Sequence, residues 1–305
     1  MTDRNERMIA SPVLFALVCM GLLVAPGRLR AGWAGRTDWK PVEYTPGGDV
    51  IYFDHVPQST NPEIRAHFSA AAESLDASSY LGALAELEKA IPLAKGSELA
   101  ALHNITAYVN LWCHLTSDAS ISSLEASLDV AAKAGDSVGR AAALSELGNL
   151  HGTYDRDFDT ALSCLSKALA INQKAGLLEG VSFDQRLIGF CLHEQGQYDS
   201  ALSHYQSALA AATSVNNYAD IVSVRASIAH LYVVKDDDAD ALSNYLQAWA
   251  DVPKAGVYDS TEVLREALRG YLEVMGADTF SAACKKQGFS QTEADALVAE
   301  LQKTE

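Results

Sequence analysis

The sequence predicts an all-α fold, a solenoid of paired helices, and three observations carry this prediction. A glycine or asparagine recurs about every forty residues, at Gly96, Gly135, Gly176, Asn216 and Gly256. All but Asn216 follow a Lys or Lys-Ala pair, which is typical of a helix that ends in a left-handed residue. The tripeptide Ala-Leu-Ser recurs in steps of 40, at 161–163, 201–203 and 241–243. Val and Ile do not gather in short alternating runs within residues 62–304, which disfavours strands.

Residues 1–34 are predicted to be a secretory signal. Their apolar run, IASPVLFALVCMGLLVA at 9–25, is followed by small residues, so cleavage is expected after Ala31 or Ala34. The alternative is an uncleaved membrane anchor at residues 9–25, because about 17 apolar residues are the shortest stretch that spans a bilayer. Export to the periplasm or the cell surface is the favoured prediction, since arginines follow the run on its far side.

Residues 35–61 have the character of a linker with a possible β-hairpin. Trp39, Val42 and Tyr44 alternate before the turn at 46–49, and a second alternation begins at Val50. An isolated hairpin is barely stable in water, so an extended linker is the other possibility. Asn61 then precedes Pro62, which indicates a helix N-cap with proline in the first turn.

From residue 62 the pattern is helix–turn–helix. The expected helices cover 62–75, 80–94, 98–115, 119–134, 138–152, 158–175, 179–195, 198–215, 218–234, 239–254, 259–275, 278–287 and 290–303. The last of them begins with Ser290 and Glu293 at capping-box spacing, and its apolar side can cover the end of an array. The predicted organisation is therefore a repeat array at 62–288 with a capping helix and tail at 289–305.

The repeats resemble the tetratricopeptide repeat (TPR) family. The family pattern is Leu-Gly in the first helix, Gly before an aromatic in the turn, and a packing Ala in the second helix. Leu147-Gly148, Gly196 with Tyr198, and Ala161 match it. The period of about 40 resembles the longer-helix class of LGN-type scaffolds, kinesin light chains and Rap-type regulators. The resemblance implies a right-handed superhelix of five to six helix pairs. Ser120, in place of the packing Ala, and Asp236 to Asp238, in place of Gly and an aromatic, depart from the pattern.

The resemblance also implies a concave groove lined by the first helix of each pair. The positions that correspond to groove positions are Tyr108, Trp112, Ala142, Ser145, Asn149, Phe183, Arg186, Phe190, His193, Ser223, Ala226, His230 and Val233. The partner-binding residues expected among them are Trp112, Asn149, Arg186, Phe190, His193 and His230. Asn149 and Arg186 would bind a peptide backbone or a carboxylate, between Phe190 and Trp112 as apolar anchors. The alternative is that the aromatics complete packing between repeats and that Arg186 pairs with a nearby acid.

Composition and motifs exclude several other functions. The net charge is −16, and it is −18 without residues 1–31, so nucleic acid is not an expected partner. The five cysteines form no CxxC or zinc-like cluster and are expected to be buried thiols, although Cys164 and Cys191 could come close. Asp155-Arg156-Asp157 and Asp236-Asp237-Asp238 resemble the start of a calcium loop, but they lack its later ligands and are better explained as helix caps. We expect no catalytic residue, no metal and no cofactor.

Two function classes remain open. The first is a non-enzymatic scaffold of the cell envelope that binds a protein or peptide in the groove of the array. The second is a structural subunit that self-associates through the repeats or through residues 35–61, by pairing of strand edges. An enzyme is disfavoured because no reactive constellation can be assembled from the spacing of the residues.

Overall fold

The computed structural model describes residues 59–77, 79–114, 117–255 and 261–303, and all regular elements among them are helices. The predicted all-α class is therefore confirmed. The described residues form two compact units that divide between Cys191 and Leu192, within one helix. We call residues 59–191 the N-terminal unit and residues 192–303 the C-terminal unit.

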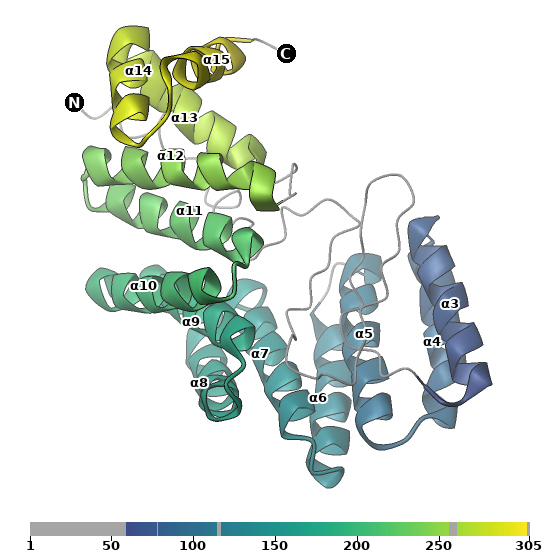
Figure 1. Ribbon diagram of the computed structural model, residues 1–305. Helices are drawn as coiled ribbons and strands as arrows, with labels where there is room; N and C mark the ends of the chain where they lie inside the picture. Colours follow the sequence, from purple (N-terminus) through teal and green to yellow (C-terminus); the bar gives the residue numbers. More distant parts are fainter. Residues whose placement is uncertain (1–58, 78, 115–116, 256–260, 304–305) are drawn as a thin grey trace. The chain divides into compact units, whose positions relative to one another are not determined.

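Six successive helix pairs and a final helix make up the described chain (Figure 1). The N-terminal unit holds α3 (Pro62–Asp76), α4 (Tyr80–Ala90), a 3-10 turn (Ile91–Leu93), α5 (Gly96–His114), α6 (Asp118–Lys133), α7 (Ser137–Thr153), α8 (Phe158–Ala175) and most of α9 (Leu178–Glu194). The C-terminal unit holds α10 (Tyr198–Ser214), α11 (Tyr218–Val234), α12 (Asp238–Ala255), α13 (Thr261–Met275), α14 (Ala277–Lys286) and α15 (Gln291–Leu301).

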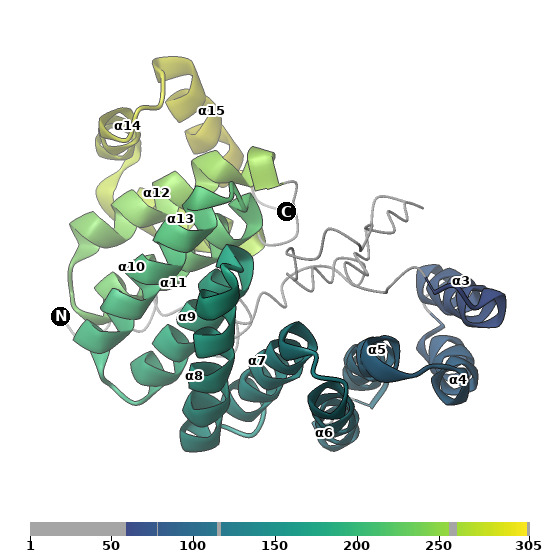
Figure 2. The same ribbon diagram turned by 60° about the horizontal axis from the view of Figure 1, so that its bottom comes forward.

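The helices of the N-terminal unit stand in two layers. Figure 2 shows α3, α5 and α7 in one layer and their partners α4, α6 and α8 in the other. Each helix packs most extensively against its pair partner, and α6 also packs against α7 of the next pair. The first helices α5 and α7 also contact each other, and hydrogen bonds from α5 to α7 and from α7 to α9 join residues about 40 positions apart.

The glycine ladder ends the pairs as predicted. Gly96, Gly135, Gly176 and Asn216 have φ angles of 58°, 69°, 69° and 54°, whereas Gly256 lies outside the described residues. In this region a Cβ atom approaches the following carbonyl oxygen, which costs about 1–2 kcal/mol for most residues. Glycine avoids that cost and asparagine tolerates the conformation, so these positions stop a helix without strain.

A second series of left-handed residues was not anticipated from the sequence. Arg156, Gly196, Asp236 and Gly276 also have positive φ angles, and they stand at steps of 40 in the turns inside the pairs. Next to two of them, Asp157 accepts a hydrogen bond from the Thr160 N–H at 3.1 Å, and Asp237 accepts one from the Asp240 N–H at 3.2 Å. The two acidic turns thus cap helices, which is the interpretation that the sequence favoured.

Small residues at fixed positions let the paired helices approach. Ala161, Ala201 and Ala241 are each 0% exposed, as are Leu165 and Tyr205 four residues after the first two. On the facing helix, Gly148 lies so close to α8 that an added Cβ would be 2.5 Å from Leu165 Cγ. The glycine of the Leu-Gly element is therefore explained in this pair by the lack of space for a larger side chain at position 148.

The serine that replaces the packing alanine in α6 has a hydrogen-bonding role. Ser120 is 1% exposed and its hydroxyl donates to the Ala107 carbonyl at 2.7 Å, while Ser127 donates to the Ala100 carbonyl at 2.8 Å. Two buried hydroxyls thus hold α6 against α5, because each would cost free energy if left without a partner.

One predicted helix is shorter than expected. The helix expected over 80–94 ends at Ala90 and continues only as the 3-10 turn over Ile91–Leu93. Pro92 explains the difference, since its ring replaces the N–H that would continue the helix and clashes with the preceding turn.

The C-terminal unit is closed by α15, as predicted. Ala294, Leu297 and Leu301 of α15 are buried in a core shared with Phe280 and Leu268. Both hydrogen bonds of the predicted capping box are present, from the Glu293 N–H to Ser290 Oγ and from the Ser290 N–H to the Glu293 carboxylate. The last apolar face of the array is therefore covered by a helix with a fixed start.

Several predictions concern residues outside the described ranges. The signal or anchor at 1–34 and nearly all of the possible hairpin at 35–61 belong to them. None of the helices in the described ranges has the length and apolarity that crossing a membrane requires.

Cys164 and Cys284 hold free thiols, and no disulfide joins Cys164 to Cys191.

Candidate functional site

A cluster of polar side chains lies within the first-helix layer of the N-terminal unit. Residues 141–150 of α7 are all buried, although this run includes Ser145, Glu146 and Asn149. Neighbouring helices add Tyr108 from α5, Asn172 from α8, and Asp184 and Arg186 from α9. Polar groups at this depth cost free energy unless they find hydrogen-bond partners, so the contacts within the cluster are informative.

Glu146 is one of two buried acids of this polar cluster. Its side chain is 6% exposed and accepts hydrogen bonds from the Tyr108 hydroxyl and, at 3.3 Å, from Asn149 Nδ2. Burial raises the pKa of this carboxyl, against the lowering effects of those two hydrogen bonds and of the Arg186 charge. Burial also raises the pKa of Tyr108, and the nearby Glu146 charge adds to that shift.

Asp184 is the second acid and is 0% exposed. Ser145 Oγ donates to its Oδ1, and Asn172 Nδ2 donates to its Oδ2 at 2.8 Å. Burial, with a smaller contribution from the negative charge of Glu146, raises the pKa of Asp184 from 3.8 to about 7, against the lowering effect of the two hydrogen bonds. This carboxyl therefore changes its charge near neutral pH.

Two buried amide oxygens stand out in the polar cluster. Asn149 Oδ1 and Asn172 Oδ1 are both buried and accept no hydrogen bond from a described residue. Their orientation follows from their amide nitrogens, which must face the carboxylates of Glu146 and Asp184. Arg186, 2% exposed, places its guanidinium carbon 5.4 Å from the centre of the Phe183 ring.

Two histidines form a second contact, in the C-terminal unit. The rings of His193 and His230 are stacked with 5.3 Å between their centres, and Tyr198 meets the His193 ring edge-on. Burial lowers the pKa of both histidines, to about 3 for His230, where the charge of His193 contributes as well. The pair is therefore neutral at physiological pH and packs as two stacked imidazole rings.

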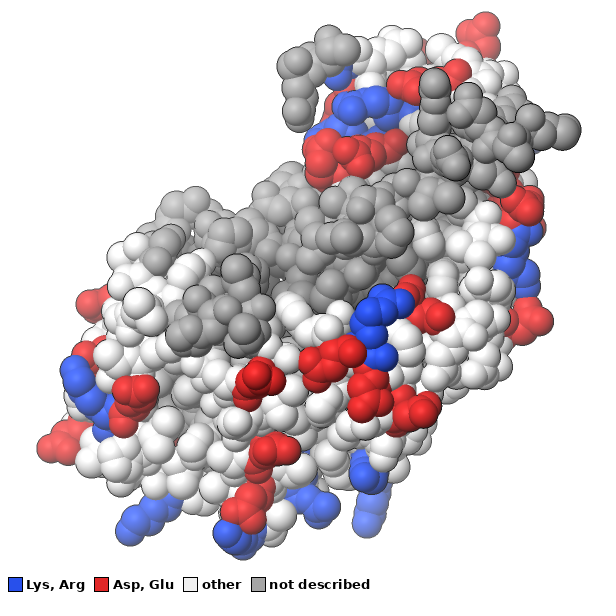
Figure 3. Space-filling model, turned by 180° about the vertical axis from the view of Figure 1, so that it is seen from behind, with Lys and Arg blue, Asp and Glu red and all other residues white. Residues whose placement is uncertain are grey.

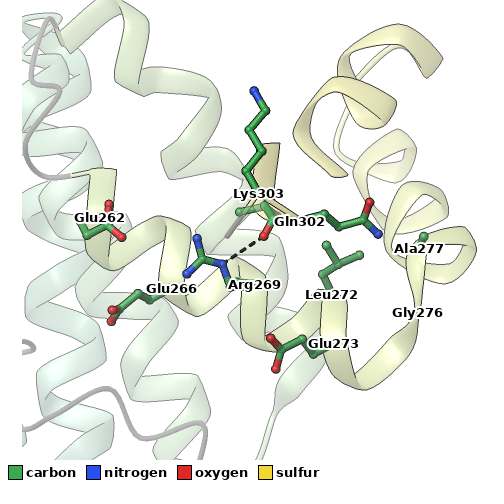
Figure 4. A pocket seen from close by; sticks show the side chains of 10 residues that line it. Glu262, Glu266, Arg269, Leu272, Glu273, Gly276, Ala277, Gln302 and Lys303 are labelled. Carbon is green, nitrogen blue, oxygen red and sulfur yellow. Dashed lines mark hydrogen bonds between the residues drawn. The ribbon is translucent and has the colours of Figure 1, made fainter. Parts of the chain in front are cut away.

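A hollow of about 680 Å³ lies beside α13, near the end of α15. Figure 4 shows the side chains of Glu262, Glu266 and Glu273 along α13, with Arg269 turned toward the end of α15. Arg269 Nε donates to the Leu301 carbonyl at 3.0 Å, so this arginine caps α15.

On the face drawn in Figure 3 the charged side chains of the described residues stand in small mixed groups.

Solved structures resemble the chain in fold. The apo form of RapI aligns with 78% of this chain and 99% of its own, at 14% identity and a TM-score of 0.56. A signal transduction ATPase with numerous domains from Pyrococcus horikoshii, which has a tetratricopeptide repeat sensor, aligns with 78% of this chain at 16% identity and a TM-score of 0.59. The aligned part is 38% of that protein.

The fold is that of the tetratricopeptide repeats. A likeness at this identity establishes architecture alone. No protein-family model matches the sequence, and no curated protein sequence matches it significantly.

In this TPR array the structure brings together only some of the predicted partner-binding residues. Asn149 and Arg186 both lie at Glu146, in the N-terminal unit. Phe190 is 1% exposed, and the side chain of Trp112 lies outside the described residues. His193 and His230 contact each other in the C-terminal unit.

Sequence reasoning missed Glu146, Asp184 and Asn172 as parts of the site. Glu146 stands in the run AAALSELGNL, where an acid among apolar and small residues of a TPR first helix signals a buried charge. Asp184 stands 39 residues after Ser145, about one repeat further, and this spacing is the signal that could have paired them.

Proposed function

We propose that this TPR array is a non-enzymatic scaffold that binds a segment of another protein against the first-helix layer of α5, α7 and α9. The observation that carries the proposal is Asn149, whose side chain is 8% exposed and whose Oδ1 accepts no hydrogen bond from a described residue. A buried acceptor without a donor costs about 1–3 kcal/mol. A peptide N–H or a side-chain donor of a bound segment would remove that cost.

The proposal is tested by binding the full chain to an immobilised library of 15-residue peptides. We expect a subset to bind, and Asn149→Ala to weaken that binding five- to a hundred-fold, the factor that corresponds to one buried hydrogen bond. Asn244→Ala is the matched control, because Asn244 lies on α12 and donates to the Asp240 carbonyl of its own helix. Equal binding by the Asn149 variant, or no selection from the library, would contradict the proposal.

We further propose that the scaffold acts in the cell envelope, after export directed by residues 1–34. The support is the apolar run at 9–25 followed by small residues. N-terminal sequencing of the protein recovered from expressing cells should find a start at Gly32 or Gly35. A start at the initiator methionine in membranes would instead indicate the retained anchor.

A further inference from the structure

We propose that the polar cluster around Glu146 and Asp184 recognises a cationic side chain, a lysine or an arginine, of the bound segment. This inference rests on the proposed function and names the chemistry of the partner. It differs from the sequence-based hypothesis, in which Asn149 and Arg186 bind a backbone or a carboxylate.

The charge balance of the polar cluster favours a cation. Two carboxyls, Glu146 and Asp184, stand against one guanidinium, that of Arg186. The hydroxyls of Tyr108 and Tyr154 also lie near Glu146, and both are neutral at physiological pH because their pKa values are raised. Ser145 and Asn172, which face Asp184 from α7 and α8, carry no charge. When both carboxyls are ionised, the polar cluster therefore carries one net negative charge, which a bound carboxylate would increase and a bound cation would neutralise.

The hydrogen-bond balance leads to the same partner. Among the described residues, no donor reaches Asn149 Oδ1, which is buried beside Glu146, or Asn172 Oδ1, which is buried beside Asp184. A carboxylate brings only acceptors, whereas an ammonium brings three donors and a guanidinium five. Asn149 is more than nine-tenths buried, so the missing donor must come from a group that reaches into the polar cluster.

The depth of Glu146 selects a long side chain. Only 6% of Glu146 is exposed, whereas Tyr108, which donates to its carboxylate, is half-buried. Lysine and arginine have flexible apolar stems that can pass along apolar surface and place a charge beyond it. The aromatic ring of Phe183, next to Arg186, offers such a surface.

The test uses the peptides that the full chain selects from the library. Each Lys or Arg in a selected peptide is replaced by Met, and affinities are measured by fluorescence polarisation at pH 7.5. We expect one such replacement to weaken binding at least ten-fold, and Glu146→Gln in the protein to weaken binding of the original peptide by a similar factor. Asp184→Asn, which keeps both hydrogen-bonding partners, should weaken it about three-fold or more.

Two control variants separate this cluster from other acids. Glu125→Gln changes an exposed carboxyl on α6, and the double variant Glu266→Gln/Glu273→Gln changes the hollow beside α13. Both should bind with unchanged affinity. Selected peptides that tolerate loss of every Lys and Arg, or that bind through an acidic residue, would overturn the inference while leaving the proposed function intact. Loss of binding in the hollow variant but not in Glu146→Gln would also overturn it.

Discussion

Replacing Asp184 with asparagine is expected to stabilise the protein by about 2–3 kcal/mol more at pH 8 than at pH 5. The pKa of this carboxyl is about 7 in the folded chain, against 3.8 for an exposed aspartate. Because the pKa is higher in the folded chain, the folded chain binds more protons than the unfolded chain between about pH 4 and pH 7. The contribution of Asp184 to stability is therefore complete below about pH 4 and is lost as the pH rises through about 7. At about 1.4 kcal/mol per pKa unit, the loss between pH 5 and pH 8 is about 2–3 kcal/mol.

Asparagine does not titrate and can keep both hydrogen bonds. Its amide oxygen can accept from Asn172 Nδ2, and its amide nitrogen can donate to the Ser145 hydroxyl, which accepts as readily as it donates. The Asp184→Asn variant should therefore lose the destabilisation that the wild-type protein shows as the pH rises.

Urea unfolding at pH 5, 6.5 and 8 measures this effect as the difference between variant and wild type. The difference is needed because His193 and His230, with lowered pKa values, destabilise the fold as the pH falls and oppose the contribution of Asp184. Asp129→Asn is the control, since Asp129 is exposed on α6 and pairs only with Lys133. A difference that stays constant between pH 5 and pH 8 would show that Asp184 is already ionised in the fold.

Replacing Gly148 with alanine should destabilise the fold by about 1–3 kcal/mol, the usual cost of one methyl group too many in a packed interior. The added Cβ would lie 2.5 Å from Leu165 Cγ, 2.8 Å from Leu165 Cδ2 and 3.1 Å from the Ala161 carbonyl oxygen. Leu165 is 0% exposed and the carbonyl belongs to the α8 backbone, so neither can give way freely.

Gly270→Ala is the matched control, because it makes the same change inside a helix with no atom within 4 Å of the new Cβ. It should stabilise the fold by up to about 1 kcal/mol, since alanine favours the helix over glycine. Thermal and urea unfolding of both variants measure the change in the free energy of unfolding, which should be negative for Gly148→Ala and positive for Gly270→Ala. The double variant Gly148→Ala/Leu165→Ala should be more stable than the sum of the single changes predicts. Additive effects would mean that Gly148 does not contact Leu165.

The sequence by itself determined the helix ends, the repeat register and the final cap. Three kinds of signal act within a few residues along the chain. They are glycine or asparagine at positive φ, asparagine or aspartate at N-caps, and the Ser290–Glu293 capping box. The packing alanines repeat at steps of 40 because every pair needs the same close approach. Local and periodic causes of this kind leave a mark in the order of residues, so the TPR fold could be predicted. Asn149 and Arg186 followed from the same register.

Only the tertiary structure decided which polar groups share the interior. Ser145 and Asp184 are 39 residues apart, and Tyr108 and Glu146 are 38 apart, so each contact exists only once neighbouring pairs have packed. Burial then raises the pKa values of the two acids, and no described residue donates to Asn149 Oδ1. The free energy of a buried charge depends on everything around it, and no single stretch of sequence contains that environment.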